Sequence, residues 1–143
     1  MKPIKLKINT KTQKYSIVIG SNLGSNVSKI LRENSINFNQ CLLVIDKNIS
    51  KHFISKIKKS LIKKKLYTHY FRANEMNKNF SNVNKILDIL LTKNFSREDC
   101  VIYIGGGITG DISGLYIDKI YQYSNYTFIS SRLIDWRKNR SKY

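Results

Sequence analysis

The chain has few cysteines and histidines, and it has no long apolar run. Its apolar stretches stay well below the roughly 18 residues that a membrane span needs, and its first residues lack the apolar block of a signal peptide. We therefore expect a cytoplasmic protein with no membrane partner. Cys41 and Cys100 form no C-x-x-C pair, and each opens an apolar run, so we interpret both as small buried residues at strand starts.

The two histidines do not form a recognisable metal site in the sequence. His52 lies among lysines and His69 among tyrosines, and neither has an acid or a thiol near it in sequence. A structural or catalytic zinc site needs three or four such ligands. We predict that both histidines are surface residues and that the chain holds no metal ligands.

Acidic residues are scarce. The 9 aspartates and glutamates face 26 lysines and arginines, which gives a net charge of +17. A basic chain can bind nucleic acid, because lysines along phosphates release counterions. Here lysine is enriched together with asparagine and isoleucine, which share A- and T-rich codons, so genome composition also explains the bias. We interpret the densest cluster, Lys56 to Lys65, as the solvated face of one helix, and we keep nucleic-acid binding as a disfavoured alternative.

Apolar periodicity predicts alternating strands and helices. Residues 3–9 and 15–20 are expected to form a strand pair, and residues 41–45, 66–71 and 100–104 to form buried strands. Helices are expected over 23–34, over 49–65, from a cap at Ser81, and over 109–121. The second helix should bury Phe53, Ile54, Ile57, Leu61 and Ile62, and the third should bury Val83, Ile86, Leu87, Leu90 and Leu91.

This alternation predicts an α/β fold with a doubly wound, mainly parallel sheet. In such sheets ligands bind beyond the carboxyl ends of the strands. Asp46 follows one buried strand, and the run from Gly105 to Asp111, GGGITGD, follows another. Glycines let backbone N–H groups approach a diphosphate, and a helix amino terminus adds a favourable dipole. On spacing alone the run is also compatible with a tight strand-to-helix turn, because it lacks the G-x-G-x-x-G pattern.

Three ordered motifs resemble the 3-dehydroquinate synthase family over about the first 120 residues. Residues 97–99 and 105–115 resemble the family's R-x-D connection and its GGGxxGDxxGF loop, with Leu115 in place of phenylalanine. Residues 46–48 match its D-x-N motif. Residues 75–78 match the end of its G-E-x-x-K motif, with Asn74 in place of glycine.

The resemblance implies a Rossmann-like amino-terminal domain that binds NAD. The residues that would line the NAD site are Asp46, Asn48, Glu75, Lys78, Gly106, Gly107, Ile108 and Asp111. Without the resemblance, Glu75 and Lys78 read as a solvated i,i+3 ion pair worth a few tenths of a kcal/mol at most.

The resemblance also implies a function. In the family, NAD and a divalent metal (zinc or cobalt) support phosphate elimination and cyclisation of DAHP, a sugar phosphate, to 3-dehydroquinate in the shikimate pathway. The metal ligands belong to a carboxyl-terminal helical domain, which is missing from these 143 residues. We therefore expect no catalytic residues in this chain and no activity from it alone, and a homodimer is compatible with the intact family. The alternatives are a relative of the polyol or iron-dependent alcohol dehydrogenases, a non-catalytic dinucleotide-binding fragment, and the basic nucleic-acid-binding protein.

The last residues depart from the family pattern. The family continues with PTTLLAQVDSSxGGKT, whereas residues 130–143 read SSRLIDWRKNRSKY. One permitted set of codons for this tail, read one base later, encodes QVDSSIGGKTGVN. The single tryptophan codon at Trp136 forces a glycine in that frame. We therefore expect an incomplete NAD-binding domain over residues 1–129 and an out-of-frame tail over residues 130–143.

Overall fold

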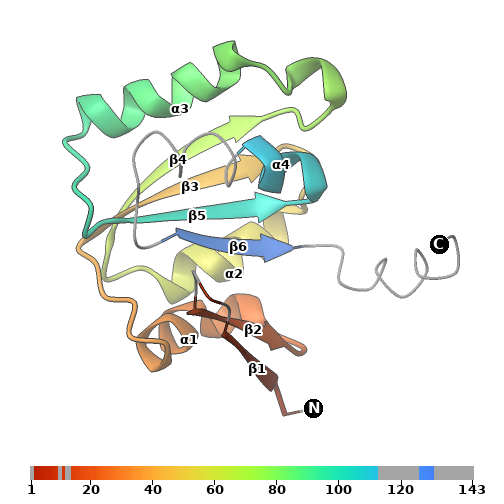
Figure 1. Ribbon diagram of the computed structural model, residues 1–143, viewed down its shortest axis with the longest axis vertical. Helices are drawn as coiled ribbons and strands as arrows, with labels where there is room; N and C mark the ends of the chain where they lie inside the picture. The colour runs from red at the N-terminus through yellow and green to blue at the C-terminus, as the bar shows by residue number, and fades with distance from the viewer. Residues whose placement is uncertain (1, 10, 12–13, 113–125, 131–143) are drawn as a thin grey trace, which may run out of the picture.

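A four-stranded parallel sheet forms the centre of the domain (Figure 1). The computed structural model describes residues 2–9, 11, 14–112 and 126–130. The strands lie in the order β4-β3-β5-β6. Their bounds are β3 (Gln40–Asp46), β4 (Lys65–Phe71), β5 (Cys100–Gly105) and β6 (Tyr126–Ser130). All three pairings are parallel, which confirms the predicted fold class.

Helices cover both faces of this sheet (Figure 1). On one face lie the short 3-10 helix η1 (Leu23–Asn26), α1 (Val27–Glu33) and α2 (Lys51–Ser60), and on the other lies α3 (Phe80–Thr92). The 3-10 turn η2 (Glu75–Asn77) follows β4, and α4 (Gly107–Asp111) follows β5. The predicted strand pair forms a separate antiparallel ribbon of β1 (Ile4–Asn9) and β2 (Lys14–Ile19).

Strand alternation divides the interior into two cores. Successive side chains of a strand point to opposite faces of the sheet. Leu43 and Ile45 of β3 pack with Ile54 and Ile57 of α2. Leu42, Val44 and Tyr103 pack on the other face with residues of α3. Because β3 and β5 are buried on both faces, they read in the sequence as continuous apolar runs.

Polar residues fix the ends of the helices. The Ser50 hydroxyl accepts a hydrogen bond from the Phe53 N–H at the start of α2. At the end of α1, Ser35 has φ 60, and the Ile36 N–H donates to the Leu31 carbonyl at 2.9 Å. Asn94 (φ 54) ends α3 in the same way, with the Phe95 N–H on the Leu90 carbonyl. Both ends are Schellman motifs in which serine and asparagine take the usual place of glycine.

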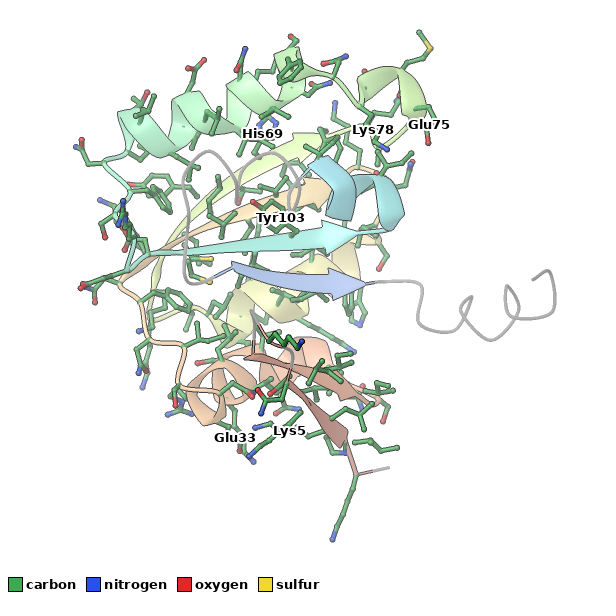
Figure 2. All side chains as sticks on the ribbon, viewed as in Figure 1. Lys5, Glu33, His69, Glu75, Lys78 and Tyr103 are labelled. Carbon is green, nitrogen blue, oxygen red and sulfur yellow. The ribbon has the colours of Figure 1, made fainter. Side chains whose placement is uncertain are left out.

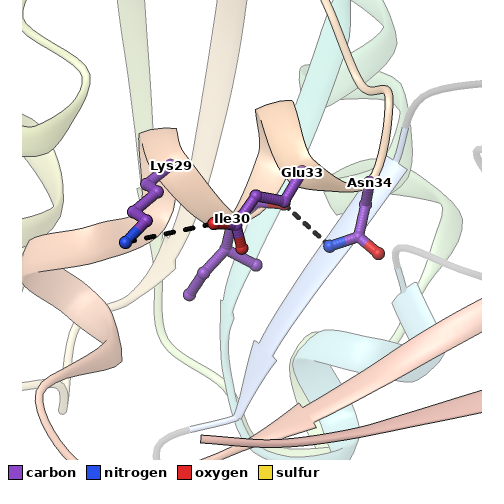
Figure 3. A network of polar contacts seen from close by, with 4 residues as sticks. All are labelled: Lys29, Ile30, Glu33 and Asn34. Carbon is purple, nitrogen blue, oxygen red and sulfur yellow. Dashed lines mark hydrogen bonds and ion pairs between the residues drawn. The ribbon is translucent and has the colours of Figure 1, made fainter.

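The last turn of α1 carries two further polar contacts (Figure 3). The Asn34 side-chain amide donates a hydrogen bond to the Ile30 carbonyl at 2.7 Å, and the Lys29 Nζ atom lies 4.0 Å from the Glu33 Oε1 atom. The ion pair is exposed, so it contributes only a few tenths of a kcal/mol. The Ile30 carbonyl also accepts the Asn34 backbone N–H at 3.1 Å, so the side-chain amide adds a second donor to this carbonyl.

Two predicted helices differ from the structure at their ends. The second helix ends at Ser60 rather than near residue 65, and Ile62 beyond it is 76% exposed. The cluster from Lys56 to Lys65 therefore spans the end of α2 and the turn that follows it, and it is not the face of one helix. A chain that turns out of the helix at Leu61 carries the next apolar side chain away from the sheet.

The third helix begins at Phe80, and its cap is Asn79 rather than Ser81. The Asn79 side chain accepts a hydrogen bond from the Asn82 N–H at 3.1 Å. The predicted apolar stripe is confirmed at Val83, Ile86 and Leu90, whereas Leu91 is 62% exposed. The helix predicted over 109–121 starts earlier, at Gly107, and its residues 113–121 lie outside the described part of the chain.

The cysteines are buried on neighbouring strands, as predicted. Cys41 of β3 is in register with Cys100 of β5, and both are free thiols with no exposed surface. Burial raises the pKa of the Cys41 thiol well above its usual range, and the Cys100 thiol beside it adds to the shift. Thiols enclosed in the core are inaccessible to reaction partners, so both cysteines act as packing residues.

The prediction for the histidines is half correct. His52 is exposed on α2, but His69 is half-buried on the α3 side of β4, and its Nε2 atom is buried (Figure 2). Burial lowers the pKa of His69, and the positive charges of Lys85 and Lys47 lower it further. Among the described residues, none of the helices has the length and apolar character of a membrane-spanning helix.

His69 makes stability depend on pH. Its pKa is lower in the folded protein than in the unfolded chain, so the unfolded chain binds the proton first as the pH falls. Its stabilising contribution is complete above the ordinary histidine pKa of about 6.5 and is lost progressively below it. In the wild-type protein the free energy of unfolding should fall as the pH drops from neutral to mildly acidic, and His69→Gln should make this fall less steep. The slope changes by less than about 1.4 kcal/mol per pH unit, the limit for one proton.

Urea denaturation across this pH range measures the effect. His52→Gln is the matched control, since His52 is exposed, and it should leave the wild-type pH profile in place. If His69→Gln and the wild-type protein have the same dependence of unfolding free energy on pH, His69 is not the source of that dependence.

Candidate functional site

Asp46 lies where three strand ends meet. It is the last residue of β3 and is 8% exposed. Its Oδ1 atom accepts a hydrogen bond from the Asn48 N–H at 3.1 Å and lies 3.5 Å from the Ala73 nitrogen, just beyond β4. A Cβ atom added to Gly105, at the end of β5, would lie 3.1 Å from the Asp46 Cβ. The structure thus places a buried carboxylate at the carboxyl edge of the sheet, as the sequence predicted.

The glycine loop passes directly beside Asp46. Gly105 ends β5, Gly106 is extended (φ −99, ψ −159), and Gly107 begins α4. An added Cβ at Gly105 would lie 2.8 Å from the Thr109 Cβ, which is closer than real side chains approach. At Gly107 an added Cβ would meet nothing within 4 Å. One glycine is therefore required by packing, and the other presents bare backbone to open space.

The structure places three of the predicted site residues of this loop in full and the backbone of the fourth, Asp111. Gly106 and Gly107 line the open side, and Ile108 is half-buried against the core on the α3 face of the sheet. Asp111 belongs to α4, and its side chain lies outside the described atoms. Thr109 was not predicted, although it is fully buried and packs against Gly105. Its spacing of four residues from Gly105 is the only sequence signal that could have indicated this contact.

Glu75 and Lys78 lie together on the turn after β4 (Figure 2). Glu75 is exposed and Lys78 is half-buried. Asn74 starts this turn in an extended conformation (φ −144), and its side chain accepts a hydrogen bond from the Asn77 N–H at 2.9 Å. No positive φ requires glycine at position 74, and asparagine supplies a cap there. The departure from the family motif at Asn74 therefore fits the local structure.

The R-x-D connection has a structural role. Asp99 is 7% exposed, and its Oδ2 atom accepts hydrogen bonds from the Ser96 N–H at 2.8 Å and the Gln40 side-chain amide at 2.9 Å. These bonds tie the entry to β5 to the start of β3. Asp99 lies at the amino end of the strands, whereas Asp46 lies at the carboxyl end.

The described residues offer no metal site. Within residues 2–9, 11, 14–112 and 126–130, no three histidine, cysteine, aspartate or glutamate side chains are grouped to hold an ion. His52 is on α2 and His69 faces α3, so the two histidines lie on opposite faces of the sheet.

Fold and site together define a doubly wound α/β domain with a carboxylate and a glycine loop at the carboxyl edge of its sheet. Residues 68–130 match the family model described as 3-dehydroquinate synthase N-terminal. The chain is 60% identical over 111 residues to the 3-dehydroquinate synthase of Pelagibacter ubique (strain HTCC1062), covering 78% of this chain and 30% of that protein. The chain is homologous to the amino-terminal part of 3-dehydroquinate synthases.

Solved structures agree in fold. A 2-deoxy-scyllo-inosose synthase matches 90% of this chain and 36% of its own chain, with a TM-score of 0.78 and 15% identity. A structure of 2-deoxy-scyllo-inosose synthase complexed with carbaglucose-6-phosphate, NAD+ and Co2+ matches 89% of this chain and 34% of its own, with a TM-score of 0.73 and 16% identity. At such identities the likeness shows the fold alone.

The two glycines should respond differently to alanine. Gly105→Ala forces its new methyl group against Thr109 and should lower the free energy of unfolding by about 1–3 kcal/mol, the usual cost of overpacking. Gly107→Ala enters open space and should stay within about 0.5 kcal/mol of wild type. Urea denaturation of both variants checks the packing, and equal losses would contradict it.

Proposed function

We propose that the domain binds NAD at the carboxyl edge of its sheet, through Asp46 and the loop from Gly105 to Gly107. The observation that carries the proposal is the contact of these two elements, 3.1 Å between the Asp46 Cβ and the Cβ position of Gly105. It sets a carboxylate beside backbone with no side chain. The NAD+ in the solved synthase complex supports the choice of ligand.

Different residues would contact different parts of the dinucleotide. Asp46 would accept hydrogen bonds from a ribose hydroxyl pair, and its Oδ1 is already held in place by the Asn48 N–H. The N–H groups of Gly106 and Gly107 would donate hydrogen bonds to the diphosphate. The open space at Gly107 leaves room for the diphosphate to approach the backbone. Glu75, Lys78, Ile108 and Asp111 complete the proposed site from the neighbouring turn and α4. When bound, NAD supplies a hydride acceptor.

For the whole protein we propose the activity of a 3-dehydroquinate synthase. The chain spans about 30% of the length of the curated relative that it matches. It would supply the NAD-binding part of a cytoplasmic shikimate-pathway enzyme that converts DAHP to 3-dehydroquinate. The synthase identity of that relative favours this proposal over an alcohol dehydrogenase function.

The metal of the family has no ligand set among the described residues, so no step is assigned to it here. Neither histidine can substitute for that set, because the two lie on opposite faces of the sheet. This chain alone should accordingly turn over no DAHP. A homodimer is compatible with the intact enzyme.

Loss of the Asp46 charge should weaken NAD binding. Asp46→Asn keeps the shape and one acceptor, but it loses charge-assisted hydrogen bonds worth about 1.5–3 kcal/mol, or roughly 10- to 100-fold in affinity. Asp88→Asn on the exposed face of α3 makes the same charge change away from the site and should leave affinity unaltered. Ligand-observed NMR of the NAD adenine protons suits the weak binding expected from this chain. Equal affinities for the two variants would refute the role of Asp46.

The domain boundary is a separate proposal. We infer that the NAD-binding domain covers residues 1–129 and that residues 130–143 are translated out of frame; the family match, which ends at residue 130, supports this boundary. Residues 131–143 lie outside the described part of the chain. Sequencing the gene from codon 129 onwards should show QVDSSIGGKTGVN in the shifted frame, continuing into a region with a glutamate and two histidines. A gene without that frame would make the tail genuine.

A further inference from the structure

A lysine-lined groove runs between α2 and β4, outside the proposed NAD site. It has a volume of about 950 Å³. Its floor is aliphatic, with Ile54 from α2, Ile62 from the following turn and Leu66 from β4. Ile62 is 76% exposed, so the floor presents apolar surface to solvent. Surface of this kind, surrounded by charged residues, is characteristic of an interaction site.

In the part of the chain that the structure describes, every charged residue that lines the groove is a lysine. They are Lys47, Lys51, Lys58, Lys59 and Lys64. The sequence from Lys47 to Asn74 contains no aspartate or glutamate, so the whole segment around the groove is basic. Lys58 donates a hydrogen bond to the Tyr70 hydroxyl at 3.3 Å and lies over the Tyr70 ring, and Lys64 lies over the Phe38 ring. Like charges gathered along one groove repel one another, and a bound carboxylate would relieve that repulsion.

The groove follows an open strand edge. β4 pairs with β3 and has no second partner strand among the described residues, and Figure 1 shows it as the outermost strand of the sheet on that side. An edge strand offers unpaired N–H and C=O groups to an added strand. Leu66 and Tyr70 line the groove four residues apart on β4, so both side chains lie on the same face of the strand, toward an added segment.

We propose that this groove binds an acidic, extended segment of a protein partner, which pairs with β4 and turns both apolar and carboxylate side chains toward α2. The apolar side chains pack on Ile62 and Leu66, and the carboxylates contact the lysines. This is strand addition to a sheet edge, with specificity set by alternate side chains. A nucleic acid fits less well, because stacking needs open aromatic faces. Among the described residues, Tyr70 is the one aromatic residue that lines the groove, and Lys58 lies over its ring.

The test uses the full chain and a short fluorescein-labelled peptide of repeated Glu-Glu-Val-Val, which sets glutamate and valine in turn along each face of a strand. Fluorescence anisotropy should show saturable binding. The double variant Lys51→Glu, Lys59→Glu should weaken binding about tenfold or more, because it reverses two rim charges. The matched control is Lys5→Glu, Lys7→Glu on β1, which makes the same charge change on exposed residues of the separate two-stranded ribbon, none of which lines the groove, and it should stay within about twofold of wild type. Ile62→Ser should also weaken binding while leaving the thermal melt intact.

Three results would overturn the proposal. Equal losses in the two double variants would mean that net charge alone attracts the peptide. Tighter binding of an oligothymidylate than of the peptide, lost in the groove variant, would assign the groove to nucleic acid. Displacement of the peptide by NAD would show that the peptide binds at the nucleotide site. If NAD does not bind but the groove variants still weaken peptide binding, the NAD proposal fails and the groove proposal holds.

Discussion

Everything at the carboxyl edge depends on the position of β3 between β4 and β5. β3 pairs in parallel on both sides, which brings the ends of three strands to one place, and all its residues after Gln40 are buried. Asp46 is the last residue of that strand, so its carboxylate lies beside the Ala73 nitrogen on one side and Gly105 on the other. A shift of one residue in register would turn Asp46 to the opposite face and separate it from both.

The same arrangement of strands explains why the motif residues at the two ends of the sheet have different roles. Asp99 and the two cysteines lie at the amino ends of the central strands, where they close a turn and fill the core. Asp46, Gly106 and Gly107 lie at the carboxyl ends, where the buried carboxylate lies close to the glycine loop and Gly107 borders open space. Residues from both groups occur in the motifs shared with 3-dehydroquinate synthases, so a shared motif does not by itself indicate contact with a ligand.

The strands were predictable from the sequence because burial on both faces leaves continuous apolar runs, as in Cys41–Ile45 and Cys100–Ile104. Helix ends were less predictable, because several residues could serve as the cap or as the last inward residue. Asn79 and Ser81 are both good caps, and only the contact with the Asn82 N–H decides between them. Ile62 fits a helical stripe, yet the helix ends two residues earlier. The contacts of Thr109 and Ala73 with the site arise from the packing of distant segments, which no local pattern encodes.

The central claim is that one edge of the sheet binds NAD. The most direct measurement is to record amide ¹H–¹⁵N spectra of the labelled chain while NAD is added. The account predicts saturable shifts at Asn48, Ala73, Gly106 and Gly107, with the amides of α2 beside the lysine groove unchanged. Shifts confined to the α2–β4 groove, or none at any NAD concentration, would contradict it.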